Sequence, residues 1–176
     1  MKHFIVFLVV PIICMSQKMF VETSEVSFFS SAPLEDIAAI SNKMEGVVDF
    51  ESGNFFFRIP ITSFMFPSSL MQKHFNEKYM ESELYDLSTF KGSFNKKISQ
   101  NYDTTLVISA IGVLNMHGKD KNVDIETRLD IDNNKVFFSS EFNVLLKDYN
   151  IKVPKIVRMN IADTILVNVS GRLMVK

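Results

Sequence analysis

The chain has 176 residues, 47% of them hydrophobic, and a formal net charge of −1. This length and composition are enough for one domain with one hydrophobic core. The near-neutral charge excludes the basic footprint that nucleic-acid binding requires, so no nucleic-acid partner is expected.

The first sixteen residues are typical of a secretory signal peptide. Lys2 precedes an apolar run over 4–13 that is too short to cross a bilayer of about 30 Å, and the small Ser16 suits a cleavage site. We therefore expect 1–16 to be removed, 17–176 to form the mature domain, and the protein to reach the periplasm or the exterior without a transmembrane segment. The alternative is a lipoprotein signal acylated at Cys14, although Ile13 stands before that cysteine where a small residue is usual.

Beyond the signal, hydrophobic residues mostly recur with a period of two, which is typical of half-buried strands. Val48 and Phe50 belong to one such strand, 52–54 supplies a turn, and 55–65 reads as the return strand. Further strands are expected around Val26 and Phe28 and over 88–98, 104–116, 122–131, 135–146 and 160–175. About eight sequential strands with short turns predict an all-β fold, an antiparallel eight-stranded lipocalin-like barrel.

Two short helices are expected at the barrel mouth. Residues 33–40 form the first, because Pro33 suits the opening turn of a helix. The second begins near Ser69 and places Met71 and Phe75 on one apolar side at i, i+4 spacing. This second helix could lie over the open end of the barrel.

Two motifs resemble those of the YceI-like lipid-binding family. The first follows the second helix into the next strand, with His74-Phe75, then Tyr79-Met80-Glu81-Ser82, then Tyr85 and Thr89-Phe90 in matching order. The second, GVLNMHG over 112–118, repeats the spacing G-x-L-x-x-H-G before a turn. Together they lie over 74–118, in the middle of the mature chain. The resemblance implies a barrel that holds an elongated isoprenoid or other acyl-type amphiphile, and it leaves the identity of the ligand open.

The inward faces of the strands and the apolar side of the second helix supply the expected ligand-binding residues. An inward apolar set serves equally well as a packed core, and the pattern alone favours a filled interior. The resemblance favours a cavity instead. The expected lining is Phe28, Val48, Phe50, Phe57, Ile59, Ile61, Met65, Ile125, Phe138, Phe142, Ile165 and Val167, with Met71 and Phe75 at the lid.

The alternative is an interaction or structural module of the cell envelope with a filled barrel and no ligand. Its partner surface would be an exposed aromatic set comprising Phe56, Phe64 and Phe66. The number of subunits stays open, and a homodimer is compatible with either function.

The sequence contains no phosphate-binding loop, nucleophile turn or cysteine metal motif, so we expect no catalytic residues, no metal and no cofactor. His74 and His117 lie 43 positions apart and would need carboxylate help to hold zinc. We expect His117 to cap a turn and His74 to anchor the helix. Basic residues over 147–158 could meet an anionic lipid head group, although a solvated loop is the simpler interpretation. The expected protein is a non-enzymatic carrier or store of a hydrophobic amphiphile.

Overall fold

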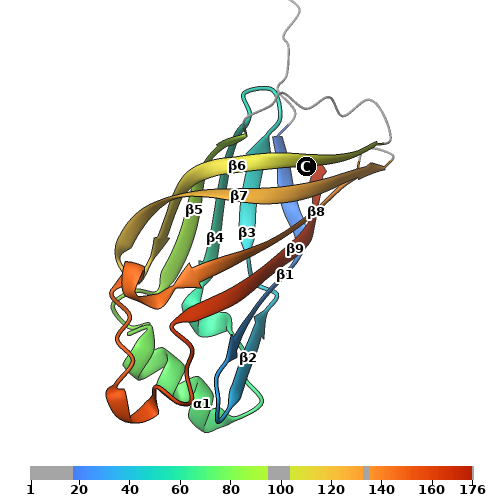
Figure 1. Cartoon of the computed structure of the whole chain (residues 1–176). Coiled ribbons are helices and arrows are strands. Elements are labelled where there is room, and N and C mark those ends of the chain that lie inside the picture. Colours follow the sequence, from blue (N-terminus) through green and yellow to red (C-terminus); the bar gives the residue numbers. More distant parts are fainter. Residues whose placement is uncertain (1–17, 95–103, 133–134, 176) are drawn as a thin grey trace, which may run out of the picture.

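The computed structural model describes residues 18–94, 104–132 and 135–175, which form one antiparallel sheet of nine strands with short helical segments at one end (Figure 1). The strands are β1 Lys18–Ser31, β2 Asp36–Ser41, β3 Glu45–Asp49, β4 Asn54–Pro60, β5 Leu87–Phe94, β6 Thr104–Met116, β7 Lys119–Asp132, β8 Lys135–Leu145 and β9 Thr164–Val175. The helical segments are η1 Ile61–Ser63, α1 Ser69–His74, η2 Phe75–Tyr79, η3 Leu146–Tyr149 and η4 Lys155–Val157.

The sheet closes into a barrel because β1 pairs with β3 along one edge and with β9 along the other. From β3 to β9 each strand pairs with the next in sequence, so β1 and β3 to β9 form the eight-stranded antiparallel barrel that the sequence predicts. The ninth strand, β2, lies beyond β3 on the same edge of β1. It pairs with 26–31 of β1, whereas β3 pairs with 18–20. The expected fold class is confirmed.

The helix expected over 33–40 is wrong, because this segment contains β2. Ile37 is half-buried, Ala39 and Ser41 are buried, and Asp36 and Ala38 are exposed, so the burial has the period of a strand. On its outer edge Ile40 exchanges two backbone hydrogen bonds with Met65, at 3.1 and 2.8 Å. Strand partners on both sides outweigh the helix-start signal of Pro33.

The second expected helix is confirmed and begins at Ser69. The hydroxyl of Ser68 caps it by accepting a hydrogen bond from the Met71 amide at 3.4 Å. After His74 the helix widens into the π-helical turn η2. Figure 1 shows α1 at the lower end of the barrel, and the chain segment that carries η4 lies at the same end.

The second motif opens with Gly112 because the backbones of β5 and β6 approach each other closely at this point. Gly92 and Gly112 are direct register partners. A Cβ atom on Gly112 would stand 2.3 Å from the Lys91 carbonyl oxygen, and one on Gly92 would stand 2.0 Å from that of Ile111. The two backbones approach too closely for any side chain at these positions.

The core is packed tightly at the end of the barrel that carries the β3–β4 and β7–β8 turns. Met19, Val48, Val136 and Leu173 are almost fully buried there. Two further clusters lie toward α1 and contain many side chains that are only half-buried. The barrel therefore has one closed end and one end covered by short helices and loops.

Candidate ligand-binding cavity

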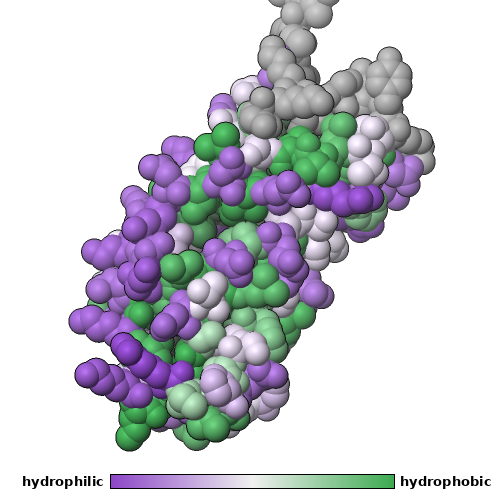
Figure 2. Space-filling model, viewed as in Figure 1, coloured by the Kyte–Doolittle hydropathy of each residue, from purple (hydrophilic) through white to green (hydrophobic). Residues whose placement is uncertain are grey.

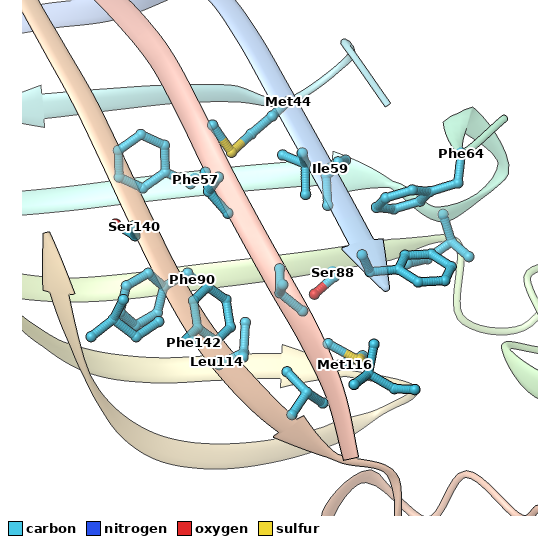
Figure 3. Close-up of a pocket in the computed structure, with 18 of the residues that line it drawn as sticks. Met44, Phe57, Ile59, Phe64, Ser88, Phe90, Leu114, Met116, Ser140 and Phe142 are labelled. Atoms are coloured by element: carbon cyan, nitrogen blue, oxygen red, sulfur yellow. The ribbon is translucent and has the colours of Figure 1, made fainter. Parts of the chain in front are cut away.

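A cavity of about 450 Å³ occupies the barrel interior. Its lining extends from Phe50 and Leu173 at the closed end to Met71, His74 and Val157 at the helical end. Figure 3 shows its labelled apolar side chains converging from several strands on one space. This volume falls within the range of small-molecule sites, about 300 to 1,000 Å³.

Aromatic rings form two groups around the cavity. In the first, Phe55 lies 4.8 Å from Phe90 and 5.7 Å from Phe57, between ring centroids. The second group lies under the helix, where Phe28 and Phe75 stack at 5.5 Å and Phe64 and Phe66 complete the cluster. Both groups present flat apolar surfaces to the interior.

The polar groups near the middle of the cavity are already paired within the protein. Thr127 and Ser140 share a hydroxyl–hydroxyl hydrogen bond of 2.8 Å, and the Ser88 hydroxyl donates to the Asn115 carbonyl at 2.6 Å. The guanidinium of Arg58, another lining residue, binds Glu45 at 2.6 Å on the exposed face of β4. The interior therefore offers apolar contact and few free hydrogen-bonding groups.

The structure brings thirteen of the expected lining residues together around the cavity. They are Phe28, Val48, Phe50, Phe57, Ile59, Ile61, Met71, Phe75, Ile125, Phe138, Phe142, Ile165 and Val167.

Met65 does not line the cavity, and its side chain is 54% exposed. The cause is the turn η1, which interrupts the inward and outward alternation of side chains after Pro60. Odd-numbered residues point inward in β4, whereas even-numbered residues point inward after the turn. Phe64 and Phe66 consequently line the cavity, although the sequence places them on an exposed partner surface. Phe64 is buried, whereas Phe56 stays on the outer face at 38% exposure.

The cavity also includes lining residues absent from the expected set. Met44, Phe55 and Val169 share strand faces with Val48, Phe57 and Ile165, so the alternation itself contained the signal. Phe90, Leu114 and Met116 line it from the two motif strands, and further lining residues come from β7, β8 and the helical segments.

The barrel wall opens between β7 and β8. These strands pair only between 127–132 and 135–140, and they diverge toward the helical end (Figure 1). The segment η3 packs against both strands there. Its Tyr149 is buried, and burial together with the charge of Asp148 raises the pKa of the Tyr149 phenol to about 12.

His117 links η3, the segment that packs between β7 and β8, to the rest of the barrel. It lies in the β6–β7 turn in a left-handed conformation, with φ of 50°, and is 6% exposed. Its Nδ1 is 3.0 Å from the carbonyl oxygen of Tyr149, and its Nε2 is 2.8 Å from a carboxylate oxygen of Glu81. The imidazole thereby joins the β6–β7 turn, η3 and the end of η2.

Among the residues that the structure describes, no group of three or more His, Cys, Asp or Glu side chains is placed to hold a metal ion. His74 lines the cavity at the helical end, and His117 is engaged with Glu81 and Tyr149. Within the same described ranges, no helix is long and apolar enough to cross a bilayer.

An eight-stranded antiparallel barrel around an apolar cavity is the architecture of lipocalin-like proteins. The model of the YceI-like domain matches residues 20–173, and the chain belongs to that family. A search of curated proteins finds no match.

Solved structures of low sequence identity share the fold. A polyisoprenoid-binding domain from Saccharophagus degradans, described as implicated in plant cell wall breakdown, superposes with a TM-score of 0.79 at 11% identity, over 91% of this chain and 99% of that chain. BcnA from Burkholderia cenocepacia gives 0.72 at 14% identity, over 85% and 95%. A YceI protein from Campylobacter jejuni gives 0.54 at 14% identity, over 98% and 97%.

Proposed function

We propose that this protein binds an isoprenoid or other long-chain amphiphile inside the barrel and carries or sequesters it. The observation that carries the proposal is the cavity of about 450 Å³, whose lining is mainly apolar and whose central hydroxyls are already paired. Removing apolar ligand surface from water drives entry at about 25 cal/mol per Å², before the cost of ordering the ligand. Membership of the YceI-like family and the likeness to a polyisoprenoid-binding domain support this ligand class.

The proposal is one of binding without turnover. The hydroxyls of Thr127, Ser140 and Ser88 donate or accept hydrogen bonds within the barrel wall, and among the described residues none of their hydrogen-bond partners is a histidine. Such groups position a ligand but lack the activated nucleophile that covalent chemistry needs.

We also propose that the protein acts outside the cytoplasm, in the periplasm or as a secreted protein. This rests on the sequence over 1–16, since residues 1–17 lie outside the described structure. N-terminal sequencing of protein recovered from the cell envelope should find a first residue at or near Gln17. An intact Met1 or an acylated Cys14 would contradict the proposal of a cleaved signal peptide.

The test of the binding function is a cavity-filling substitution with a matched control. Val167 lines the cavity, whereas the adjacent Leu166 of β9 does not. Val167→Phe should reduce the amphiphile that copurifies with the protein at least tenfold, because the added ring occupies ligand volume. Leu166→Phe adds a ring outside the cavity and should leave the load unchanged. Native mass spectrometry and lipid extraction measure both.

Circular dichroism and thermal melting must show that both variants fold. A folded Val167→Phe variant with the full lipid load would place any bound lipid elsewhere. Wild-type protein that copurifies with no amphiphile, and takes none up from added isoprenoid or fatty acid, would favour the filled-barrel module instead.

A further inference from the structure

We propose that the helical end of the barrel docks on an anionic lipid bilayer, so that the cavity exchanges its amphiphile with the membrane directly. This inference rests on the proposed lipid-binding function and adds the partner that supplies or receives the ligand. The docking surface, here called the mouth rim, consists of Leu34, Leu70, Ile156 and Met159 together with the cations Lys152, Lys155 and Arg158.

The apolar side chains of the mouth rim are unusually exposed for their type. Ile156 is 90% exposed, Leu34 69%, Leu70 60% and Met159 51%. Leu34 lies between β1 and β2, Leu70 in α1, Ile156 in η4 and Met159 in the turn that follows η4. Exposed large apolar side chains gathered at one place are typical of an interaction surface.

Two elements of the mouth rim, the β1–β2 loop and the segment after η4, are held next to one another. The amide of Leu34, between β1 and β2, donates to the Met159 carbonyl at 2.9 Å, and the Asn160 side chain donates to Glu35 at 3.4 Å. These bonds join the β1–β2 loop to the segment after η4. Figure 2 shows hydrophobic side chains beside strongly hydrophilic ones at the lower tip, where Figure 1 places this segment.

The cavity ends at this same surface. Val157 and Asn160 line it, and they alternate along the chain with Ile156 and Met159 of the rim. Met71 lines it from α1, next to the exposed Leu70. A ligand that leaves the cavity here passes between residues of the mouth rim.

The charge of the mouth rim selects an anionic partner. Lys152, Lys155 and Arg158 are exposed, and the chain carries no acidic residue between Asp148 and Asp163. None of these three cations forms an ion pair with a described residue. Three carboxylates lie on the rim elements. Glu35 accepts a hydrogen bond from Asn160, Asp36 is exposed at the start of β2, and Glu77 lies 4.0 Å from Lys73.

Cations that alternate with exposed apolar side chains match the interface of a bilayer with anionic head groups. The apolar side chains enter the boundary of the acyl region, and the cations meet the phosphates above it. A second copy of the chain fits less well, because two such rims would bring like charges together. The bilayer is also the phase in which an isoprenoid or acyl amphiphile resides.

Flotation with vesicles tests the docking. Protein should float with vesicles of phosphatidylglycerol and phosphatidylcholine, bind vesicles of phosphatidylcholine alone at least tenfold more weakly, and detach in high salt. The double variants I156S/M159S and K155E/R158E should each lower binding at least tenfold. The matched controls are V107S/I111S, which removes two exposed apolar side chains from β6, and K91E/K135E, which reverses two exposed charges elsewhere. Both controls should bind as the wild type does.

Transfer of a fluorescent acyl probe from loaded protein to the vesicles should be slower for the rim variants than for the wild type, and unchanged for the control variants. Wild-type protein that fails to float, or rim variants that float as well as the controls, would overturn the docking proposal. A wild-type dimer that I156S/M159S dissociates would make the rim a self-interface and overturn it equally. Rim variants that keep a full lipid load would show that the cavity is intact. A protein that docks on vesicles but takes up no amphiphile would refute the proposed lipid-binding function and leave the docking proposal standing.

Discussion

At the scale of single residues, the buried histidine of the GVLNMHG motif acts as a structural tie. The two groups hydrogen-bonded to the His117 ring, the Tyr149 carbonyl and the Glu81 carboxylate, are both acceptors. The imidazole donates to the Tyr149 carbonyl through Nδ1, because a carbonyl oxygen only accepts hydrogen bonds. The motif residue therefore secures the segment that fills the opening between β7 and β8.

We expect His117→Ala to lower the free energy of unfolding by about 1 to 3 kcal/mol, because the Tyr149 carbonyl would be left buried and unpaired. Glu81→Gln should lower the free energy of unfolding by less, since the Glu81 side chain is 47% exposed and solvent weakens its interaction with His117. Urea denaturation measures both. Equal stability of His117→Ala and the wild type would show that the tie contributes nothing.

The phenol of Tyr149 predicts a loss of stability at alkaline pH. Burial and Asp148 raise its pKa to about 12, so the folded protein holds the neutral phenol more firmly than the unfolded chain does. This contribution is complete below pH 10 and is lost as pH rises from about 10 toward 12, by up to about 3 kcal/mol.

Urea denaturation at intervals between pH 9 and pH 12 tests this contribution. Tyr149→Phe has no phenol to ionise, so its unfolding free energy should fall less steeply over this range than that of the wild type. Lysines titrate in the same range in both proteins and cancel in the comparison. Parallel curves for the two proteins would contradict the assignment.

At the scale of elements, strict alternation made the central strands predictable. The bounds of β6 agree with the expected 104–116, and β8 starts at Lys135 as expected. In β7, Ile125, Leu129 and Ile131 are buried while Glu126 and Arg128 are exposed, as the pattern requires. Tertiary packing adds little to such segments because their own sequence already separates the two faces.

Prediction failed where a local signal competed with partners distant in sequence. Pro33 favoured a helix, but β1 and Met65 supply strand partners on either side of β2. Met65 was placed inside because the alternation was continued past Pro60, and the turn η1 cannot be read from the period of β4. The tie from His117 to Tyr149 spans 32 positions and leaves no trace in either local pattern.

One aromatic residue fastens the helix α1 and its π-helical turn to the barrel. The Phe75 ring lies 5.5 Å from Phe28, 5.8 Å from Phe64 and 5.0 Å from Phe66, between centroids. These contacts fasten the helix to β1 and to the segment after η1. The ring is half-buried and also lines the cavity, so it connects lid packing with ligand contact.

We expect Phe75→Ala to accelerate ligand exchange several-fold while it lowers the free energy of unfolding by about 1 to 3 kcal/mol. Phe56→Ala is the matched control, because Phe56 is 38% exposed on the outer face of β4 and should leave exchange unchanged. Stopped-flow exchange of a fluorescent acyl probe measures the rate. An unchanged rate in folded Phe75→Ala protein would remove the lid function from this helix.

At the scale of the whole molecule, the barrel is asymmetric along its axis. One end is closed by the tight cluster around Met19 and Leu173, and the other is covered by α1, η2 and the segment of η4. Exchange through the closed end would require fully buried side chains to move, whereas the helical end needs only loops and a short helix to shift. Ligand entry and membrane docking therefore belong to the same end.

A ligand held inside the barrel must stabilise the whole fold, because it binds the folded chain and not the unfolded one. At a free ligand concentration one hundred times the dissociation constant, the gain is about 2.7 kcal/mol. For a domain of this size that raises the melting temperature by about 5 to 10 °C.

We expect protein stripped of lipid to melt lower by this amount and to recover when an isoprenoid or fatty acid is added back. Val167→Phe should melt at the same temperature with or without the added amphiphile, since its ring fills the space that the ligand needs. Differential scanning calorimetry measures the shift. Loaded and stripped wild-type protein that melt together, although mass spectrometry shows lipid bound, would place that lipid on the surface and not in the barrel.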